Sequence, residues 1–455
     1  MTIKWRVLEN KWRKKWDENH VFEADPDPNK PKYYLTVAYP YPNSPQHIGH
    51  GRTYTLADIH ARYMRMKGYN VLLPMAFHYT GTPILAMSKR LVSGDKDLIE
   101  TFTSLYNVSQ NKIRDFSDPI NIARHFHQEL KLGMKEIGYS IDWRREFTTV
   151  DPQYNRFIEW QFTTLRKKGF ITQGSHPVGW CPNEGNPVGQ HDTLGDVEPE
   201  IGEYTVIKFQ FDEYIIPTAT LRPETIYGVT NIWIRPDIIY VKILVDGEKW
   251  IVSKECEKKL KYLGRKVKQE GLINGSDIVG KSVLNPLINS SHIILPAPFV
   301  NPNNGTGLVM SVPAHAPYDL QALKDLSNDE KSLEKYNISI ETVKLLKPIS
   351  IVESEGYTDI PTEDILQKKG ISSQSDIKLE EVTSELYAHE FHLGIMKSNT
   401  DTCTGMNIPE AREFVKISMF KENKASMMHE IMNGNIACRC GTACVVKMFE
   451  NQWFI

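Results

Sequence analysis

The sequence predicts an α/β protein in which one half of a doubly wound domain is interrupted by an inserted, β-rich domain of mixed α/β character. Residues 33–77 have the pattern strand, loop, helix, strand, which is the βαβ unit of a doubly wound sheet. Residues 204–253 contain short runs of alternating apolar and polar residues, which predict a compact β-rich domain. Residues 443–455 form a further strand-like run, so the chain could return to the first sheet after the insertion.

Each element of the first unit has its own signal. Residues 1–31 begin as a helix and end in a loop rich in proline and aspartate. The β-branched and aromatic runs at 33–42 and 69–77 predict two buried strands. Between them, apolar residues recur at helical spacing, which predicts a helix face packed on the core, formed by Leu56, Ile59, Tyr63 and Met66. Gly68 stands where this helix would end.

The rest of the chain suggests three domains. Residues 84–175 are helical in pattern, and residues 176–204 are rich in glycine, proline and turn residues. The β-rich part that follows gives way to mixed sequence after about 320 and to a predicted helix at 405–436. We therefore expect a first half-domain, an inserted domain and an incomplete return to the first fold, at residues 1–195, 196–395 and 396–455.

Composition limits the class of protein. The 455 residues, 40% apolar and 24% charged, fit two or three globular domains. The formal net charge of -2 provides no global basic field, so a nucleic acid would have to bind local patches such as Lys258–Lys268. No apolar run is long enough to cross a membrane, and the charged N-terminus lacks the apolar core of a signal peptide. We expect a cytoplasmic protein with no membrane partner.

The first candidate site is His47-Ile48-Gly49-His50, between the first strand and the first helix of the βαβ unit. A helix N-terminus offers free N–H groups and the positive end of its dipole to phosphate. Gly49 allows a nucleotide to approach the backbone, and two imidazoles can donate hydrogen bonds as charge builds on a phosphate. The context favours ATP binding at His47, Gly49 and His50, although such a sequence alone also fits a metal pair or two surface histidines.

His47–His50 spell the HIGH signature of class I aminoacyl-tRNA synthetases, and residues 38–84 are similar to the leucyl members of the archaeal and eukaryotic type. The discriminating string is AFHYTGTPI, because isoleucyl and valyl members usually carry an acidic residue where His78 stands. The resemblance implies a Rossmann-type nucleotide-binding half-domain, with Tyr41 and His78 around the amino-acid pocket. It also implies leucine–tRNA ligase chemistry, in which L-leucine attacks the ATP α-phosphate with Mg²⁺ on the leaving phosphates and is then transferred to tRNA(Leu).

The second signature of this family, the KMSKS loop, is not found. Met87-Ser88-Lys89-Arg90 resembles it but follows the first signature too closely and lies in a helical pattern, so we assign it to a helix surface. The resemblance implies the N-terminal portion of a longer enzyme that lacks this loop and the anticodon-binding domain. Such a chain would be a shortened enzyme or half of a split one, with a second chain supplying the rest, and incomplete for aminoacylation.

Two segments resemble the editing domain of the leucyl, isoleucyl and valyl enzymes: TATLRPETIYGVTN (218–231) and GTGLVMSVPAHAPYD (305–319). Editing hydrolyses mischarged tRNA(Leu), because one methyl group gives only about 1–3 kcal/mol of discrimination. The resemblance implies that Asp319 binds the substrate α-amino group and that Thr225 excludes leucine. The other pocket residues implied are Thr218, Thr220, Arg222, Gly307 and Val309. Each segment alone also fits an ordinary strand or helix start.

The cysteines suggest a metal site. Three of the six lie at 438, 440 and 444, and in a reducing compartment such a cluster favours metal over disulfides. Related enzymes carry a zinc ribbon, often of two CxxC pairs, but here Glu184 stands where a second cysteine would complete the pair of Cys181. A zinc site of Cys181, His191, Cys438 and Cys440 is conceivable, and a lost or incomplete site fits equally well.

Three other functions fit part of this pattern. An isoleucyl-tRNA synthetase fragment shares both signatures. A generic nucleotidyltransferase shares the histidine loop but has neither the insertion nor the editing segments. A tRNA-binding or editing-only chain fits the missing KMSKS loop but not the intact His47, His50 and Asp319.

Overall fold

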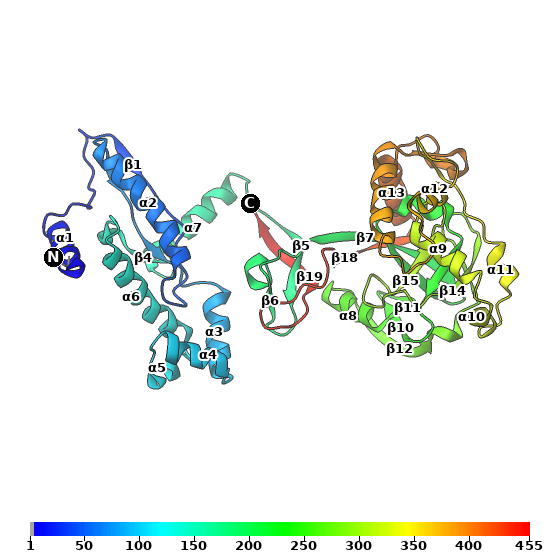
Figure 1. Cartoon of the computed structure of the whole chain (residues 1–455), viewed down its shortest axis with the longest axis horizontal. Coiled ribbons are helices and arrows are strands. Elements are labelled where there is room, and N and C mark those ends of the chain that lie inside the picture. The colour runs from blue at the N-terminus through cyan, green and yellow to red at the C-terminus, as the bar shows by residue number, and fades with distance from the viewer. Residues whose placement is uncertain (1–3) are drawn as a thin grey trace. The chain divides into compact units, whose positions relative to one another are not determined.

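The computed structural model describes residues 4–455, which form two compact units (Figure 1). The first unit comprises Met1–Gln173 with Trp453–Ile455, and the second comprises Gly174–Gln452. This division falls elsewhere than the expected boundaries at 195 and 395. Within the described residues, no helix is both long and apolar enough to cross a membrane.

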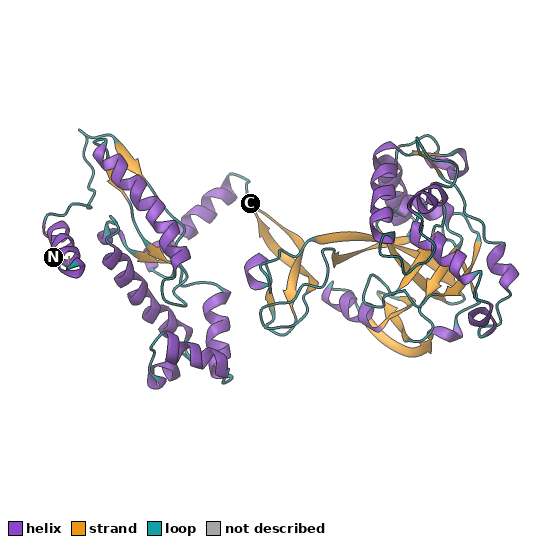
Figure 2. Ribbon diagram, in the orientation of Figure 1, coloured by secondary structure: helices purple, strands orange, loops and turns teal. Residues whose placement is uncertain are grey.

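The first unit is mostly helical, with short strands (Figure 2). Its elements are α1 (Trp5–Glu18), β1 (Lys32–Tyr34), α2 (Ile48–Met66), β2 (Asn70–Leu72), β3 (Ala76–Phe77), α3 (Thr82–Val92), α4 (Lys96–Glu100), a π-helical turn η1 (Thr101–Leu105), α5 (Gln110–Asp115), α6 (Pro119–Ile137), a 3-10 turn η2 (Trp143–Arg145), β4 (Phe147–Thr148) and α7 (Pro152–Lys167).

The predicted βαβ unit is present. Strand β1 pairs in parallel with β2, from Lys32 opposite Asn70 to Tyr34 opposite Leu72, and α2 connects them. The first strand is shorter than the predicted run at 33–42, whose two prolines lack the N–H that a ladder needs. The segment that resembles KMSKS lies in helix α3, as predicted.

The prediction for the buried face of helix α2 was wrong. Its four apolar residues are mostly exposed, with exposed fractions of 64, 59, 56 and 86% for Leu56, Ile59, Tyr63 and Met66. The buried face of α2 consists of Tyr54, Asp58 and Ala61. Asp58 can lie there because its carboxylate accepts hydrogen bonds from Ser140 N–H at 2.6 Å and Arg62 Nε at 2.7 Å. Periodicity thus identified the helix but not the face that meets the core.

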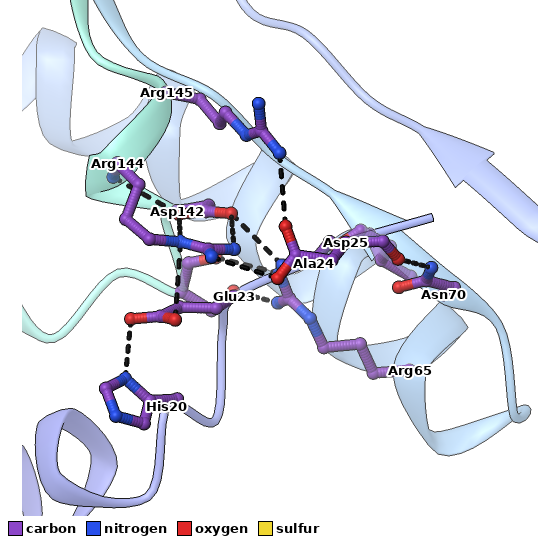
Figure 3. A network of polar contacts seen from close by, with 11 residues as sticks. His20, Glu23, Ala24, Asp25, Arg65, Asn70, Asp142, Arg144 and Arg145 are labelled. Atoms are coloured by element: carbon purple, nitrogen blue, oxygen red, sulfur yellow. Dashed lines mark hydrogen bonds and ion pairs between the residues drawn. The ribbon is translucent and has the colours of Figure 1, made fainter. Parts of the chain in front are cut away.

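A buried aspartate joins the segment after α1 to the rest of the first unit (Figure 3). The Asp142 carboxylate accepts a hydrogen bond from Ala24 N–H at 3.0 Å and from Nη2 of Arg144 at 2.9 Å. Arg144 also pairs with Asp25 at 3.0 Å, and the Asp25 carbonyl accepts from Asn70 at 2.6 Å. Burial alone would raise the pKa of Asp142, but the bonds from Arg144 and Ala24 hold it below its usual value.

The second unit is built on one large sheet and a small three-stranded sheet (Figure 2). Its strands are β5 (Thr172–Cys181), β6 (Asn186–Pro187), β7 (Ile201–Phe211), β8 (Tyr214–Thr220), β9 (Asn231–Ile234), β10 (Ile239–Val245), β11 (Glu248–Ser253), β12 (Val267–Asn274), β13 (Ser282–Leu284), β14 (Ser291–Pro296), β15 (Leu308–Ser311), β16 (Val352–Glu353), β17 (Ile395–Met396), β18 (Ala425–Ile431) and β19 (Val445–Phe454). Its helices are α8 (Lys254–Tyr262), α9 (Pro317–Leu326), α10 (Glu330–Glu334), α11 (Ile340–Lys344), α12 (Pro361–Lys369), α13 (Leu379–Leu393) and α14 (Ile408–Lys421), with 3-10 turns η3 (Gln190–Asp192), η4 (Pro223–Gly228), η5 (Gly275–Asp277) and η6 (Ser398–Cys403).

The ten-stranded sheet has the order β12-β10-β11-β8-β7-β13-β14-β9-β15, and β18 also pairs with β7. Strand β7 pairs with β18 along residues 201–207 and with β8 along residues 205–211, so Thr205 lies opposite Met427 on one side and Thr220 on the other. Helices α9, α12 and α13 pack on one another, and α14 contacts both α13 and turn η4.

Two expectations for the end of the chain were wrong. The helix expected at 405–436 ends at Lys421, and the chain then forms strand β18, which lies antiparallel to β7 from Ala425 to Ile431. The last strand, β19, joins β5 and β6 in the three-stranded sheet and not β1 and β2. Local sequence predicted strand character in β19, but pairing partners are set by tertiary contacts.

Candidate functional site

The two histidines of the first candidate site lie at the N-terminus of helix α2 and hold its first turn. His47 is the N-cap residue, and its Nδ1 accepts a hydrogen bond from Gly49 N–H at 3.1 Å. Nδ1 of His50 accepts from the His47 N–H at 3.4 Å. Because a nitrogen that accepts carries no proton, each neutral ring keeps its proton on Nε2. Both imidazoles can therefore act as hydrogen-bond donors to a ligand.

The surroundings of His50 favour its neutral form. The rings of His47 and His50 are stacked with their centroids 4.0 Å apart. Burial lowers the pKa of His50, and the neighbouring His47 lowers it further. A Cβ on Gly49 would lie 2.9 Å from Cε1 of His47, so a side chain there would displace the His47 ring. A helix N-terminus with two Nε2–H donors suits an anionic ligand such as a phosphate.

The structure brings Tyr41 and His78 together. Their rings are stacked, with centroids 4.8 Å apart. Gly81 lies beside them with φ +111, and a Cβ there would be 3.3 Å from the Tyr41 ring. Thr149, which the sequence analysis did not identify, accepts hydrogen bonds from both N–H groups of residues 79–80, at 3.0 and 3.2 Å. These contacts fix the loop that carries His78.

A buried relay from helix α6 supports the same loop. The Tyr79 hydroxyl lies 2.8 Å from Nδ1 of His127, and Nε2 of His127 lies 2.7 Å from Glu146. Lys131 forms an ion pair with the other oxygen of Glu146. Burial alone would raise the pKa of Glu146, but His127 and Lys131 hold it below its usual value. Sequence reasoning missed these residues because they are far apart in the chain and match no local motif.

The threonine-rich segment forms the end of strand β8 and the turn η4. The Thr225 hydroxyl donates to the Arg222 carbonyl at 2.7 Å, which fixes its side-chain rotamer. The Thr220 hydroxyl accepts from the Arg222 N–H at 3.0 Å. Thr218 is fully buried, and among the described residues its hydroxyl has no hydrogen-bond partner. Because such a group is destabilising, the Thr218 hydroxyl is a candidate for a ligand contact.

The segment 305–319 meets the threonine-rich segment at several points, for example where Thr230 N–H donates to the Ser311 carbonyl at 3.0 Å. A Cβ on Gly305 would lie 2.8 Å from the Cβ of Ala219. Farther along, Arg222 donates a hydrogen bond to the carbonyl of His315 at 3.1 Å. The two segments predicted to share a pocket therefore lie side by side, although many residues separate them in the sequence.

Gly307 directly precedes strand β15, and Val309 lies within that strand, between these last two contacts. Gly307 has φ +79, and a Cβ there would lie 2.5 Å from the Cβ of Ser253, so glycine is required. Its carbonyl accepts from the Tyr240 hydroxyl at 3.0 Å. Val309 lies in β15 between two buried neighbours and exposes 37% of its surface, so its side chain is open to a ligand.

Asp319 lies in the first turn of helix α9 with only 6% of its surface exposed. Its Oδ1 accepts from the Trp233 indole N–H at 2.9 Å, and its Oδ2 accepts from the Val312 N–H at 2.8 Å. Burial raises the pKa of Asp319 to about 7, although both hydrogen bonds oppose the shift. A cation would stabilise this carboxylate, as the predicted contact with an α-amino group requires.

Arg222, predicted to bind the substrate, is held inside the protein. Its three guanidinium nitrogens donate to Glu224 at 3.3 Å, to the His315 carbonyl at 3.1 Å and to Glu390 at 2.6 Å. Its guanidinium lies 4.5 Å from the ring centroid of Tyr387. Burial alone would lower the pKa of Arg222, but the two glutamates keep it raised. These bonds tie the threonine-rich segment to His315 and to Glu390, and the contact of Arg222 with a substrate stays a prediction.

Three of the four predicted metal ligands lie together. The thiols of Cys181, Cys438 and Cys440 are within 4.8 Å of one another, and Cys181 and Cys440 are 3.5 Å apart. His191 does not join them, since its side chain is 89% exposed. Instead, the Glu184 carboxylate lies 3.6 Å from the Cys438 thiol. Three clustered thiols with a nearby carboxylate fit zinc, which accepts sulfur, nitrogen and oxygen ligands.

Comparisons with known proteins extend over almost the whole chain. A family model described as tRNA synthetases class I (I, L, M and V) matches residues 11–455. The leucine–tRNA ligase of Archaeoglobus fulgidus is 46% identical over 453 residues, which cover 99% of this chain and 48% of that protein. The leucine–tRNA ligase of Methanopyrus kandleri is 45% identical over 452 residues, covering 99% of this chain and 48% of that protein. The chain thus spans about half the length of the curated relatives it matches.

A solved structure of the P. falciparum cytosolic leucyl-tRNA synthetase editing domain is 21% identical, with a TM-score of 0.46. That match covers 50% of this chain and 99% of the solved chain.

Proposed function

This chain belongs to the class I tRNA synthetases, the family of the I, L, M and V enzymes, and on that premise we propose that it is the N-terminal portion of a leucine–tRNA ligase. The observation that carries the proposal is the 46% identity to a leucine–tRNA ligase over 99% of the chain. The whole enzyme would use ATP to activate L-leucine and would transfer it to tRNA(Leu).

For the activation step, the chain supplies the groups around the phosphates and the amino acid. The Nε2–H donors of His47 and His50 would stabilise the charge that develops on the α-phosphate, beside the N-terminus of α2. Mg²⁺, when bound, would neutralise the leaving phosphates. The stacked rings of Tyr41 and His78 would border the leucine side chain. A partner chain or segment with the KMSKS loop would complete the site.

For the editing step, we assign hydrolysis of mischarged tRNA(Leu) to the pocket between the two adjoining segments, in the domain expected at 196–395. Asp319 would bind the α-ammonium of the wrong amino acid as a carboxylate. The unpaired hydroxyl of Thr218 would accept or donate a hydrogen bond to the ester end. Thr225, whose rotamer is fixed, would exclude leucine and so protect the correct product.

We propose zinc as a structural ion of the three-stranded sheet. Cys181, Cys438 and Cys440 would bind it, with Glu184 or the neighbouring Cys444 as the fourth ligand. The ion would cross-link the end of β5 to the segment between β18 and β19. This small sheet has few buried residues, so such a cross-link would stabilise it. We further propose that the protein acts in the cytoplasm, where these thiols would stay reduced.

The test is deacylation of isoleucyl-tRNA(Leu) by the purified chain beside its Asp319→Ala variant. Hydrolysis by the parent and not by the variant supports the proposal. Hydrolysis of valyl-tRNA(Ile) in its place would favour the isoleucyl alternative, and hydrolysis of neither substrate would contradict the editing assignment. Leucine-dependent ATP–pyrophosphate exchange by the chain alone should be weak or absent.

A further inference from the structure

Helix α13 carries a carboxylate, Glu390, that contacts both segments of the proposed editing pocket and that no motif in the sequence indicates. Its Glu390 has no exposed surface, yet both carboxylate oxygens are occupied. Oε2 accepts from Nη2 of Arg222 at 2.6 Å, and Oε1 lies 2.6 Å from Nδ1 of His315. Arg222 belongs to one wall of the pocket and His315 to the other. One carboxylate therefore connects the two segments that carry Thr225 and Asp319.

The backbone carries this connection to the proposed functional side chains. The Arg222 carbonyl accepts hydrogen bonds from both the N–H and the hydroxyl of Thr225, at 3.0 and 2.7 Å. On the other side, the N–H of His315 donates to the Val312 carbonyl at 3.0 Å, and the N–H of Val312 donates to Asp319 at 2.8 Å. Movement of Arg222 or His315 would thus displace Thr225 or Asp319 directly.

The hydrogen-bond pattern requires a carboxylate at position 390. Nε2 of His315 accepts from the Ile351 N–H at 2.9 Å, so this nitrogen carries no proton and the neutral ring must have its proton on Nδ1. Both groups that face Glu390, Nδ1–H and the Arg222 guanidinium, are therefore donors. Glutamine has only one acceptor oxygen, and its NH₂ group would face a donor. No rotamer of glutamine satisfies both partners.

Stability alone is a weak reason for this arrangement. Glu390, Arg222 and Glu224 are all buried, and Arg412 lies 3.5 Å from the second oxygen of Glu224. Buried ion pairs often contribute little net stability relative to apolar side chains of similar size, because each charge loses its hydration. What they do provide is a fixed geometry for the groups they join, which a hydrolytic pocket needs.

We propose that Glu390 is a positioning residue of the editing pocket, which sets the geometry of Thr225 through Arg222 and of Asp319 through His315. This inference rests on the proposed hydrolysis of mischarged tRNA(Leu). Tyr387, one helical turn before Glu390 on α13, lies over the Arg222 guanidinium. Glu390 has no exposed surface and both of its oxygens are bonded to Arg222 and His315, so it would act on a substrate through these two residues, and its effect is expected in kcat.

The first experiment measures deacylation of isoleucyl-tRNA(Leu) by the full chain, its Glu390→Gln and Glu390→Asp variants, and a Glu381→Gln control. Glu381 lies on the same helix with an exposed side chain, 3.9 Å from Lys369. We expect Glu390→Gln to lower kcat on the order of 10- to 100-fold with KM changed less than about threefold. Glu390→Asp keeps both acceptor oxygens and should retain more activity than Glu390→Gln, and the control should match the parent. Equal kcat for Glu390→Gln and the parent overturns the inference.

The second experiment is amide hydrogen exchange, which needs no activity. In Glu390→Gln, protection should fall at Thr225 and Val312 by at least about tenfold, while strands β10–β12 keep theirs. If both Glu390→Gln and Glu390→Asp lose amide protection equally across the whole second unit, the role of Glu390 is structural alone and the inference is overturned. If the parent chain hydrolyses nothing, the proposed function fails. Selective loss of protection would still support the mechanical link, and unchanged protection would contradict it.

Discussion

Removal of the Asp319 charge tests whether burial of this carboxyl controls how the stability of the second unit depends on pH. Burial raises the pKa of this carboxyl from 3.8 to about 7. The unfolded carboxyl ionises near pH 4 and the folded one near pH 7. The stability linked to this group is therefore fully present below about pH 4 and is lost as pH rises through 7. A shift of about three pKa units corresponds to about 4 kcal/mol, because one unit is worth about 1.4 kcal/mol.

Asp319→Asn keeps the shape of the side chain and removes the titration. An amide has one acceptor oxygen, so either Trp233 Nε1–H or Val312 N–H loses its acceptor, whereas the protonated parent at pH 4 still offers its hydroxyl oxygen as a weaker second acceptor; the loss costs about 1–3 kcal/mol. The variant should therefore be less stable than the parent at pH 4 and more stable at pH 8. The difference in the free energy of unfolding between the two proteins should change by about 4 kcal/mol over this range.

The assay is urea unfolding of both proteins at intervals between pH 4 and pH 8, followed by circular dichroism and tryptophan fluorescence. Asp325→Asn, on the same helix α9, controls for loss of one acidic side chain. A difference between parent and Asp319→Asn that changes by less than about 1 kcal/mol over the whole range would refute the reasoning. If the carboxylate binds the substrate ammonium, the deacylation rate of the parent should also rise as pH increases through about 7.

Three further changes test other parts of the structure. Cys181→Ser should abolish binding of one zinc per chain, and His191→Ala should leave it intact. Metal analysis of the purified proteins measures this, and the reverse result would restore His191 as a ligand. Asp142→Ala should lower the free energy of unfolding of the first unit by about 2–3 kcal/mol, because it leaves the buried N–H of Ala24 without its acceptor and removes one partner of Arg144, and an unchanged urea midpoint would contradict this. Thr218→Val removes an unpaired buried hydroxyl, so the free energy of unfolding should stay equal or rise by about 1 kcal/mol. The same change should slow deacylation of isoleucyl-tRNA(Leu). A lower melting temperature would argue that the hydroxyl has a partner within the protein.

Much of the candidate site could be read from the sequence because its parts are local. His47, Gly49 and His50 act within one turn of one helix, and their spacing alone makes the capping arrangement and the stacked rings possible. The pattern of the β-rich strands was equally local, since alternation of apolar and polar residues is a property of each strand by itself. Strands β7, β8, β10 and β11 lie where this alternation predicted them.

The predictions that were wrong concern which other part of the chain a correctly identified helix or strand packs against. The apolar face of α2 was correctly identified as apolar but lies exposed, while Asp58, a residue that hydropathy would place outside, is buried by its bonds to Ser140 and Arg62. Strand β19 has clear strand character, but its pairing with β5 is a contact between distant parts of the chain.

By itself, the sequence determined the family signatures, the βαβ unit, and the residue types available for phosphate, ammonium and metal. Only the tertiary structure decided which of them work together. It placed His191 in solvent and Glu184 beside the thiols, and it turned Arg222 inward to meet Glu390, a residue 168 positions away in the chain. The physical reason is that burial and pairing are properties of a neighbourhood. A carboxylate is costly to bury alone and stable between two donors, and those donors come together only when the chain has folded.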